Sequence, residues 1–248
     1  MELLISVGVI AFSALLLILF TRRFQNGADI NLRPLDALKV LEGHVGEAIE
    51  SGSQLHLSLG QAGLASVASP TSISALSVLD HLAKDGCANG TPPLVTVGDP
   101  TLLPAGQESL RHAYASAKRT GEYRPGQVQF VASETDAFAY AGGVASVVQQ
   151  EKIVSNVLVG RFGPELAIVS EAAGRKNIGQ VIGSDDPVAL ALATAVTENV
   201  LIGEELLAAA AYLEGSPAQL ASLRAQDVLR LIAMLVILGS ALFQMFGG

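Results

Sequence analysis

Residues 155–165 read SNVLVGRFGPE, and this stretch guides the interpretation of the whole chain. A run of β-prone apolar residues passes directly into a turn that contains two glycines and a proline. A continuous apolar run, rather than strict alternation of apolar and polar residues, is typical of a strand that is buried on both faces of a parallel sheet. The stretch therefore predicts a strand and a tight turn within an α/β sheet.

Four similar runs lie at residues 55–59, 94–98, 128–132 and 178–183, each bounded by Gly, Pro, Ser or Asp. Helix-like segments separate them, including PVALALATAV at 187–196, whose alanine content favours a buried helix. This alternation predicts a Rossmann-like three-layer α/β sandwich with a mostly parallel five-stranded sheet.

Both ends of the chain are apolar enough to cross a membrane. Residues 3–20 carry no charge and, as a helix at 1.5 Å per residue, would cover about 27 Å. The last charge of the chain is Arg230, and 18 uncharged residues follow it. The pattern Ser216-Pro217-Ala218-Gln219 predicts the start of a helix that continues into this second segment. A cleaved signal peptide is the alternative for the first segment, and a buried helix for the second.

These features predict three parts: an N-terminal transmembrane anchor at 1–23, a Rossmann-like domain at 24–215, and a juxtamembrane helix continuing into a C-terminal transmembrane helix at 216–248. The basic residues beside the spans all lie on the side of the central region: Arg22, Arg23, Arg33, Arg224 and Arg230. Basic residues favour the cytoplasmic side. We therefore expect two spans in a bacterial inner membrane, a cytoplasmic central domain, and both termini outside.

The composition limits the kinds of partner. Half of the 248 residues are hydrophobic, and residues 31–223 carry 11 Lys and Arg against 20 Asp and Glu, so nucleic acid is not an expected partner. The lipid bilayer is one, because the basic residues gather beside the spans and suit an anionic lipid surface. Cys87 is the only cysteine, which excludes an internal disulfide and fits a reducing compartment.

Functional residues are expected beyond the carboxyl ends of the strands, where open parallel sheets bind ligands. Glycines, carboxylates and one arginine follow the five predicted strands. The candidate ligand-binding residues are Gly60, Gly63, Asp99, Glu134, Asp136, Arg161, Glu165, Asp185 and Asp186.

The turn GRFGPE is a poor phosphate site by its sequence. Pro164 removes one backbone donor, and Glu165 puts a negative charge where an anion would lie, although Arg161 could compensate. The turn GQAG at 60–63 is a better nucleotide candidate, but a lone G-x-x-G is a weak signal. We expect no cofactor.

The carboxylates have two interpretations. They could line one acidic pocket that binds a divalent or organic cation, or they could cap helices and stabilise helix dipoles, which is the simpler explanation. No G-x-S-x-G, H-E-x-x-H or metal-type Cys/His spacing is present, and the four histidines are scattered. His56, in a predicted strand, is interpreted as a hydrogen-bonded core residue, and no catalytic residue is assigned.

The two terminal spans, NVLVGRFGPELAIVSEAA, the GSDDP turn and LIGEELLAAAAYL resemble an uncharacterised bacterial family of two-span membrane proteins, catalogued as a domain of unknown function. The resemblance covers most of the chain. It implies this architecture and no catalytic residues.

The leading functional hypothesis is a membrane-anchored, non-enzymatic scaffold or assembly protein that forms a homo-oligomer or belongs to a membrane complex. The alanine-rich segments LLAAAAYL and ALALATAV would provide its close-packing surface. The alternative is a nucleotide or divalent-cation sensor or transport accessory subunit that binds at the strand ends. A hydrolase using Asp99, Asp136 and Asp185 is a third hypothesis.

Overall fold

The computed structural model describes residues 2–27 and 32–246, and the side chains of residues 2–5, Glu134 and Phe246 lie outside this description. The chain forms two compact units. One comprises Met1–Arg33 and Glu214–Gly248, and the other is Pro34–Leu213.

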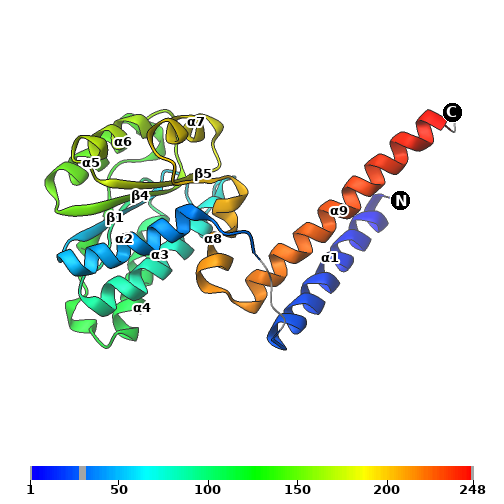
Figure 1. The fold of residues 1–248 in the computed structure, drawn as a ribbon, viewed down its shortest axis with the longest axis horizontal. Coiled ribbons are helices and arrows are strands. Elements are labelled where there is room, and N and C mark those ends of the chain that lie inside the picture. The colour runs from blue at the N-terminus through cyan, green and yellow to red at the C-terminus, as the bar shows by residue number, and fades with distance from the viewer. Residues whose placement is uncertain (1, 28–31, 247–248) are drawn as a thin grey trace. The chain divides into compact units, whose positions relative to one another are not determined.

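The unit Pro34–Leu213 alternates strands and helices along the chain (Figure 1). Its elements are α2 (Asp36–Ser51), β1 (Gln54–Gly60), α3 (Ser69–Asn89), β2 (Leu94–Val97), α4 (Leu102–Ser116), β3 (Val128–Phe130), α5 (Ala137–Gln150), β4 (Ile153–Arg161), α6 (Leu166–Arg175), β5 (Gly179–Ser184), α7 (Pro187–Val196), β6 (Val200–Ile202) and α8 (Glu204–Glu214).

The six strands form one parallel sheet in the order β3-β2-β1-β4-β5-β6. This is the strand order of a Rossmann fold. The predicted fold class is therefore confirmed, with six strands rather than five. The missed strand, β6, has only three residues, and only Leu201 among them is buried.

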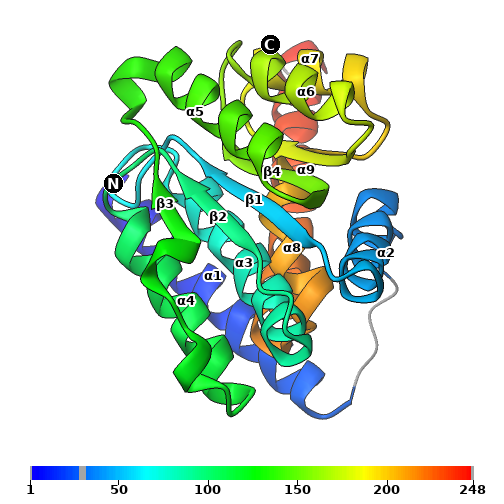
Figure 2. The same ribbon diagram turned by 90° about the vertical axis from the view of Figure 1, so that its left-hand side faces the viewer.

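Two hydrophobic clusters, one on each face of the sheet, give the domain its three layers. One cluster includes Leu57, Val157 and residues of α2, α3, α4 and α8. The other includes Leu158, Ile182 and residues of α5, α6 and α7. Successive residues of a strand point to opposite faces, so the continuous apolar runs supply both clusters. Figure 2 shows the helices on the two sides of the sheet.

The two alanine-rich segments differ in how much of their surface the domain buries. In α8, Ala209 and Ala211 are buried beside Leu206. The prediction that residues 187–196 form a buried helix is correct for the helix and wrong for its burial, since only Ala189 and Ala193 of α7 are buried. The reason is that α7 packs at the margin of the sheet, against β5 and the edge strand β6.

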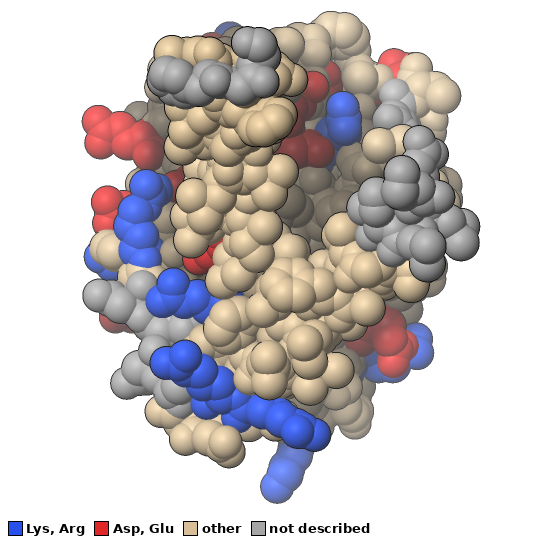
Figure 3. Space-filling model, turned by 90° about the vertical axis from the view of Figure 1, so that its right-hand side faces the viewer, with Lys and Arg blue, Asp and Glu red and all other residues tan. Residues whose placement is uncertain are grey.

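The other unit consists of two helices, α1 (Glu2–Gln25) and α9 (Pro217–Phe246), which lie side by side and antiparallel (Figure 1). The helix α9 begins as its capping pattern predicts, because Ser216 Oγ accepts a hydrogen bond from Gln219 N at 3.4 Å. By length and composition, the segments Ser6–Gln25 and Pro217–Met245 could each cross a membrane. Figure 3 shows their broad uncharged surface, with Lys and Arg gathered at one end.

Candidate functional site

The candidate site lies where the strand order reverses. From β1 the chain adds β2 and β3 on one side, and from β4 it adds β5 and β6 on the other. The connections that leave β1 and β4 therefore diverge, and this is the position at which open α/β sheets bind ligands. The turn after β1 and the turn after β4 form the two sides of the site.

Glycines let these two turns come together. Gly60 has φ +78°, and a Cβ added there would lie 2.7 Å from the carbonyl oxygen of Arg161. A Cβ added at Gly160 would come even closer to the carbonyl oxygen of Leu59. A backbone hydrogen bond of 3.1 Å from Gln61 N to Arg161 O joins the turns. Only glycine fits such a close approach of two backbones.

The carboxylate of Glu165 takes the hydrogen-bond donors of this turn. Its Oε1 accepts from Gly163 N at 2.7 Å and from Gln61 Nε2 at 2.9 Å, and the residue is only 3% exposed. A phosphate would need those same donors. Glu165 therefore already uses two donors that a phosphate bound at this turn would need.

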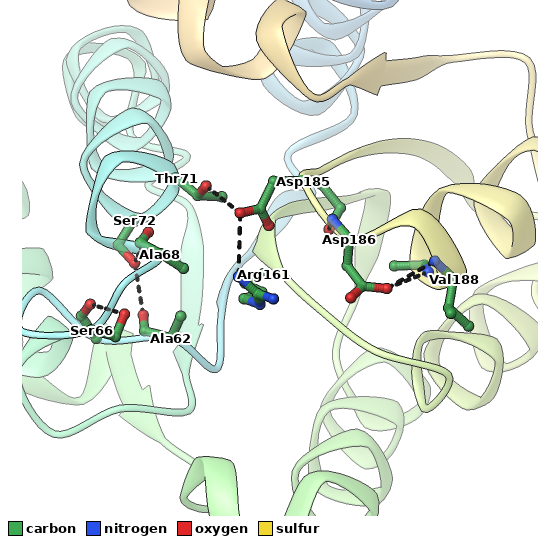
Figure 4. Close-up of polar contacts among 12 residues, drawn as sticks. Ala62, Ser66, Ala68, Thr71, Ser72, Arg161, Asp185, Asp186 and Val188 are labelled. Carbon is green, nitrogen blue, oxygen red and sulfur yellow. Dashed lines mark hydrogen bonds and ion pairs between the residues drawn. The ribbon is translucent and has the colours of Figure 1, made fainter.

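Asp185 connects the turns after β4 and β5 with the start of α3 (Figure 4). Its Oδ2 accepts from Thr71 Oγ1 at 2.9 Å and lies 3.6 Å from Arg161 Nη1. Its Oδ1 is buried and has no hydrogen-bond partner in the part of the chain that the structure describes. Asp185 therefore keeps a buried carboxylate oxygen that could accept a further hydrogen bond.

Asp99 and Gly63 lie close together because Asp99 helps to hold the turn after β2 against the turn after β1. Asp99 Oδ1 accepts from Thr101 N at 2.7 Å and also contacts the Thr101 hydroxyl. That hydroxyl accepts from Leu64 N at 2.9 Å, which ties the turn after β2 to the turn after β1. A Cβ at Gly63 would overlap the Asp99 carboxylate.

Two further carboxylates act as helix caps. Asp136 Oδ1 accepts from Ala139 N at 3.2 Å at the start of α5. Asp186 Oδ1 accepts from Val188 N at 2.9 Å and Ala189 N at 3.1 Å at the start of α7 (Figure 4). The side chain of Glu134, a predicted site residue, lies outside the described residues.

The carboxylates thus share one edge of the sheet but make separate local contacts. Among the residues that the structure describes, no group of three or more His, Cys, Asp or Glu side chains is arranged to hold a metal ion. The hypothesis of one acidic pocket gains no support from this arrangement. Sequence reasoning missed Thr71 and the side-chain role of Gln61, although Gln61 lies within the GQAG turn that it singled out.

Comparison with known families supplies the identity that the geometry does not. The sequence profile of a domain of unknown function, DUF6754, matches residues 1–247. The chain belongs to the DUF6754 family. No curated protein and no protein of known structure matches it significantly.

Beneath the carboxyl edge of this DUF6754 domain lies a row of buried polar side chains. His56 Nδ1 donates to Asn156 Oδ1 at 2.7 Å, and Nε2 lies 3.0 Å from Thr96 Oγ1. Ser58 Oγ and Tyr140 Oη are 2.6 Å apart. Burial lowers the pKa of His56 to about 4 and raises the pKa of Tyr140 to about 12, so both are neutral at pH 7. As the sequence predicts, His56 is a hydrogen-bonded core residue.

The carboxyl edge also carries exposed apolar side chains that the sequence did not reveal. Nine large apolar side chains described between Pro34 and Leu213 are exposed. Eight of them lie at the ends of strands, in the connections that follow, or in the first turns of the next helices: Val67, Ile73, Phe130, Phe138, Ile168, Val188, Ile202 and Leu207. The ninth, Val196, is at the opposite end of α7.

Proposed function

We propose that this DUF6754 protein is a membrane-anchored, non-enzymatic assembly protein whose α/β domain docks another protein on the carboxyl edge of its sheet. The observation that carries the proposal is the one-sided distribution of exposed apolar side chains. Val67 is 99% exposed and Phe138 is 64% exposed, and both follow strand ends.

This one-sided distribution indicates a docking surface because exposing apolar side chains to water is unfavourable. Apolar surface gains about 25 cal/mol for each Å² that is removed from water, and groups of exposed apolar side chains commonly mark interaction sites. Single exposed apolar residues scattered over a surface need no explanation. Here they come from five different strand connections and share one edge, which supports docking rather than chance exposure.

The anchoring part of the proposal rests on the two terminal helices. Both could span a membrane, and being antiparallel they would return the chain to the side from which it came. Arg22 and Arg23 lie in the last turns of α1, and Arg224 and Arg230 lie in the N-terminal half of α9. We infer that this side is the cytoplasm of a bacterial cell and that the domain lies there, with both termini outside.

Site-specific photocrosslinking tests the proposal. A benzoylphenylalanine residue is placed at Phe138 in one variant and at Val196 in another, and the full chain is irradiated in its native membranes. We expect a discrete adduct, either with a second copy or with one other protein identified by mass spectrometry, from position 138 and none from position 196. Equal labelling from both positions, or none from 138, would refute docking at this edge.

One observation favours a second candidate function, the binding of a small ligand at the point where the strand order reverses. The buried Oδ1 of Asp185 has no partner in the described residues, beside the half-exposed Arg161. A cationic or hydrogen-bond-donating ligand could satisfy that oxygen. Thermal unfolding with Mg²⁺, Ca²⁺ and ATP tests this: a ligand-dependent stabilisation should disappear in Asp185→Asn and persist in Asp186→Asn. The absence of any shift would remove this candidate.

A further inference from the structure

We infer that the protein docked on the carboxyl edge presents a helix with basic and apolar side chains. This inference rests on the proposed function and adds the chemistry of the partner. It follows from three properties of the same edge: its charge, its exposed apolar side chains, and the kind of backbone that it leaves available.

The net negative charge of the domain is concentrated at the carboxyl ends of its strands. Seven carboxylates with described positions lie at the carboxyl edge: Asp99, Asp136, Glu165, Asp185, Asp186, Glu204 and Glu205. Arg161 is the one Lys or Arg among the strand ends and connections there, and it is paired with Asp185.

The basic side chains lie mostly at the other end of the strands. Of the ten Lys and Arg between Pro34 and Leu213, eight lie in the C-terminal halves of helices or in connections that lead into strands: Lys84, Arg111, Lys118, Arg119, Arg124, Lys152, Arg175 and Lys176. Acidic helix starts and basic helix ends each stabilise the helix dipole locally. Although each acidic residue has this local role, together these residues leave the carboxyl edge strongly negative.

A negative edge with exposed apolar groups selects among possible occupants. An anionic lipid surface would be repelled by the carboxylates. A second copy docked through the same edge would bring two negative edges together. The opposite edge of a second copy does not match the charge, because its eight basic residues stand among eight carboxylates: Glu47, Glu50, Asp80, Asp85, Glu122, Glu151, Glu171 and Glu198. Val196 is also its one exposed large apolar side chain among the described residues. A different protein with both basic and apolar side chains satisfies both requirements.

The backbone of the edge indicates a helix rather than a strand. At the carboxyl edge each strand passes through a connection into the next helix. The two open sides of the sheet, where a partner strand could be added, belong to the outer strands β3 and β6 instead. A docked segment would contact side chains and helix starts, so it would have to satisfy its own backbone hydrogen bonds. An amphipathic helix does this and concentrates apolar groups on one face with basic groups beside them.

Binding of a model peptide to the full chain tests the inference. The protein is placed in nanodiscs of zwitterionic phosphatidylcholine, and the probe is a fluorescent amphipathic helix of Lys, Leu and Ala. A matched peptide has Glu in place of Lys, and empty nanodiscs give the lipid background. We expect chain-dependent binding of the Lys peptide alone, weakened about tenfold or more between 50 and 500 mM salt.

Two sets of variants, three for charge and two for apolar contact, separate these contributions to binding. Asp136→Asn and Asp186→Asn keep an oxygen that can cap the helix while removing the charge, and each should weaken binding about threefold to tenfold at low salt, whereas Glu151→Gln at the opposite edge should not. Phe138→Ser should weaken binding about tenfold, and Val196→Ser should leave it unchanged.

Three outcomes would overturn the inference: no chain-dependent binding, equal binding of the Lys and Glu peptides, or equal effects of the edge variants and their controls. A fluorophore on Phe138→Cys that reports an apolar environment in nanodiscs without peptide would instead identify lipid as the occupant. Crosslinking of the edge to an acidic partner would contradict the basic helix and leave the proposed function intact. The absence of any edge crosslink would contradict the proposed function itself.

Discussion

Replacing Gly60 by alanine should destabilise the domain more than its turn conformation alone explains. At φ +78° an L-residue costs about 1–2 kcal/mol. The new Cβ would also lie 2.7 Å from Arg161 O and 2.8 Å from Arg161 N, closer than real Cβ atoms come to such neighbours. Relieving that contact requires the turns after β1 and β4 to separate, at about 1–3 kcal/mol. Together these give about 2–5 kcal/mol of lost stability.

Gly52→Ala is the matched control, because Gly52 has a similar φ of +60° and its added Cβ would meet nothing within 4 Å. It should cost only the conformational part, about 1–2 kcal/mol. Urea unfolding of the full chain in detergent, followed by circular dichroism, gives both free energies of unfolding. If Gly60→Ala and Gly52→Ala lose the same stability, the two turns are not in contact and the site has a different geometry.

Three further predictions concern buried polar groups. The pKa of His56 in the folded protein, about 4, lies below its unfolded value of 6.5. The neutral side chain therefore contributes stability that is fully present above pH 6.5 and is lost as pH falls toward 4. The loss is about 1.4 kcal/mol per pH unit, or about 3 kcal/mol in all. His56→Gln should abolish this pH dependence in unfolding titrations, and an unchanged profile would contradict it. Glu165→Ala leaves Gln61 Nε2 and Gly163 N without their acceptor, so it should lower the free energy of unfolding in urea by about 1–3 kcal/mol. Glu165→Gln keeps an acceptor oxygen and should lower it less. Equal losses in the two variants would refute the role of that oxygen. Burial raises the pKa of the Cys87 thiol to about 11. A maleimide should therefore react with Cys87 only after urea unfolds the domain, as followed by mass spectrometry. Rapid labelling of the folded chain would show that Cys87 is accessible.

Local patterns were sufficient for most of the fold. The four inner strands β1, β2, β4 and β5 were recognisable as continuous apolar runs, because helices cover both faces of a central parallel strand. The edge strand β3 was also predicted, although only Val128 of its three residues is buried. The sixth, Val200–Ile202, is short, lies at the margin of the sheet, and runs directly into helix-forming residues. The strand order could not be predicted, because it depends on which side of the sheet each crossover helix packs, and no local pattern encodes that.

The sequence predicted which edge of the sheet would hold the candidate residues, but not the contacts that they make there. The rule that parallel strands end at one edge correctly gathered Gly60, Asp99 and Asp185 there. Which groups pair depends on register and side-chain reach, so the contacts of Asp185 with Thr71 and of Glu165 with Gln61 could not be read from spacing. The exposure of Phe138 was equally hidden, because a phenylalanine near a helix start looks like a core residue until the packing is known.

The most direct test of the account is cysteine accessibility at the carboxyl edge. Because Cys87 is the only native cysteine, Cys87→Ala provides a background in which Phe138→Cys and Val196→Cys are each a single reporter. A membrane-impermeant maleimide is applied to intact spheroplasts, to inside-out vesicles, and to the chain purified in detergent.

We predict no labelling of either position in spheroplasts, and labelling of Phe138→Cys in inside-out vesicles that is several times slower than labelling of Val196→Cys. That difference should disappear when purification in detergent removes the partner. Equal rates in the vesicles would contradict docking on the carboxyl edge, and labelling in intact spheroplasts would contradict a cytoplasmic domain.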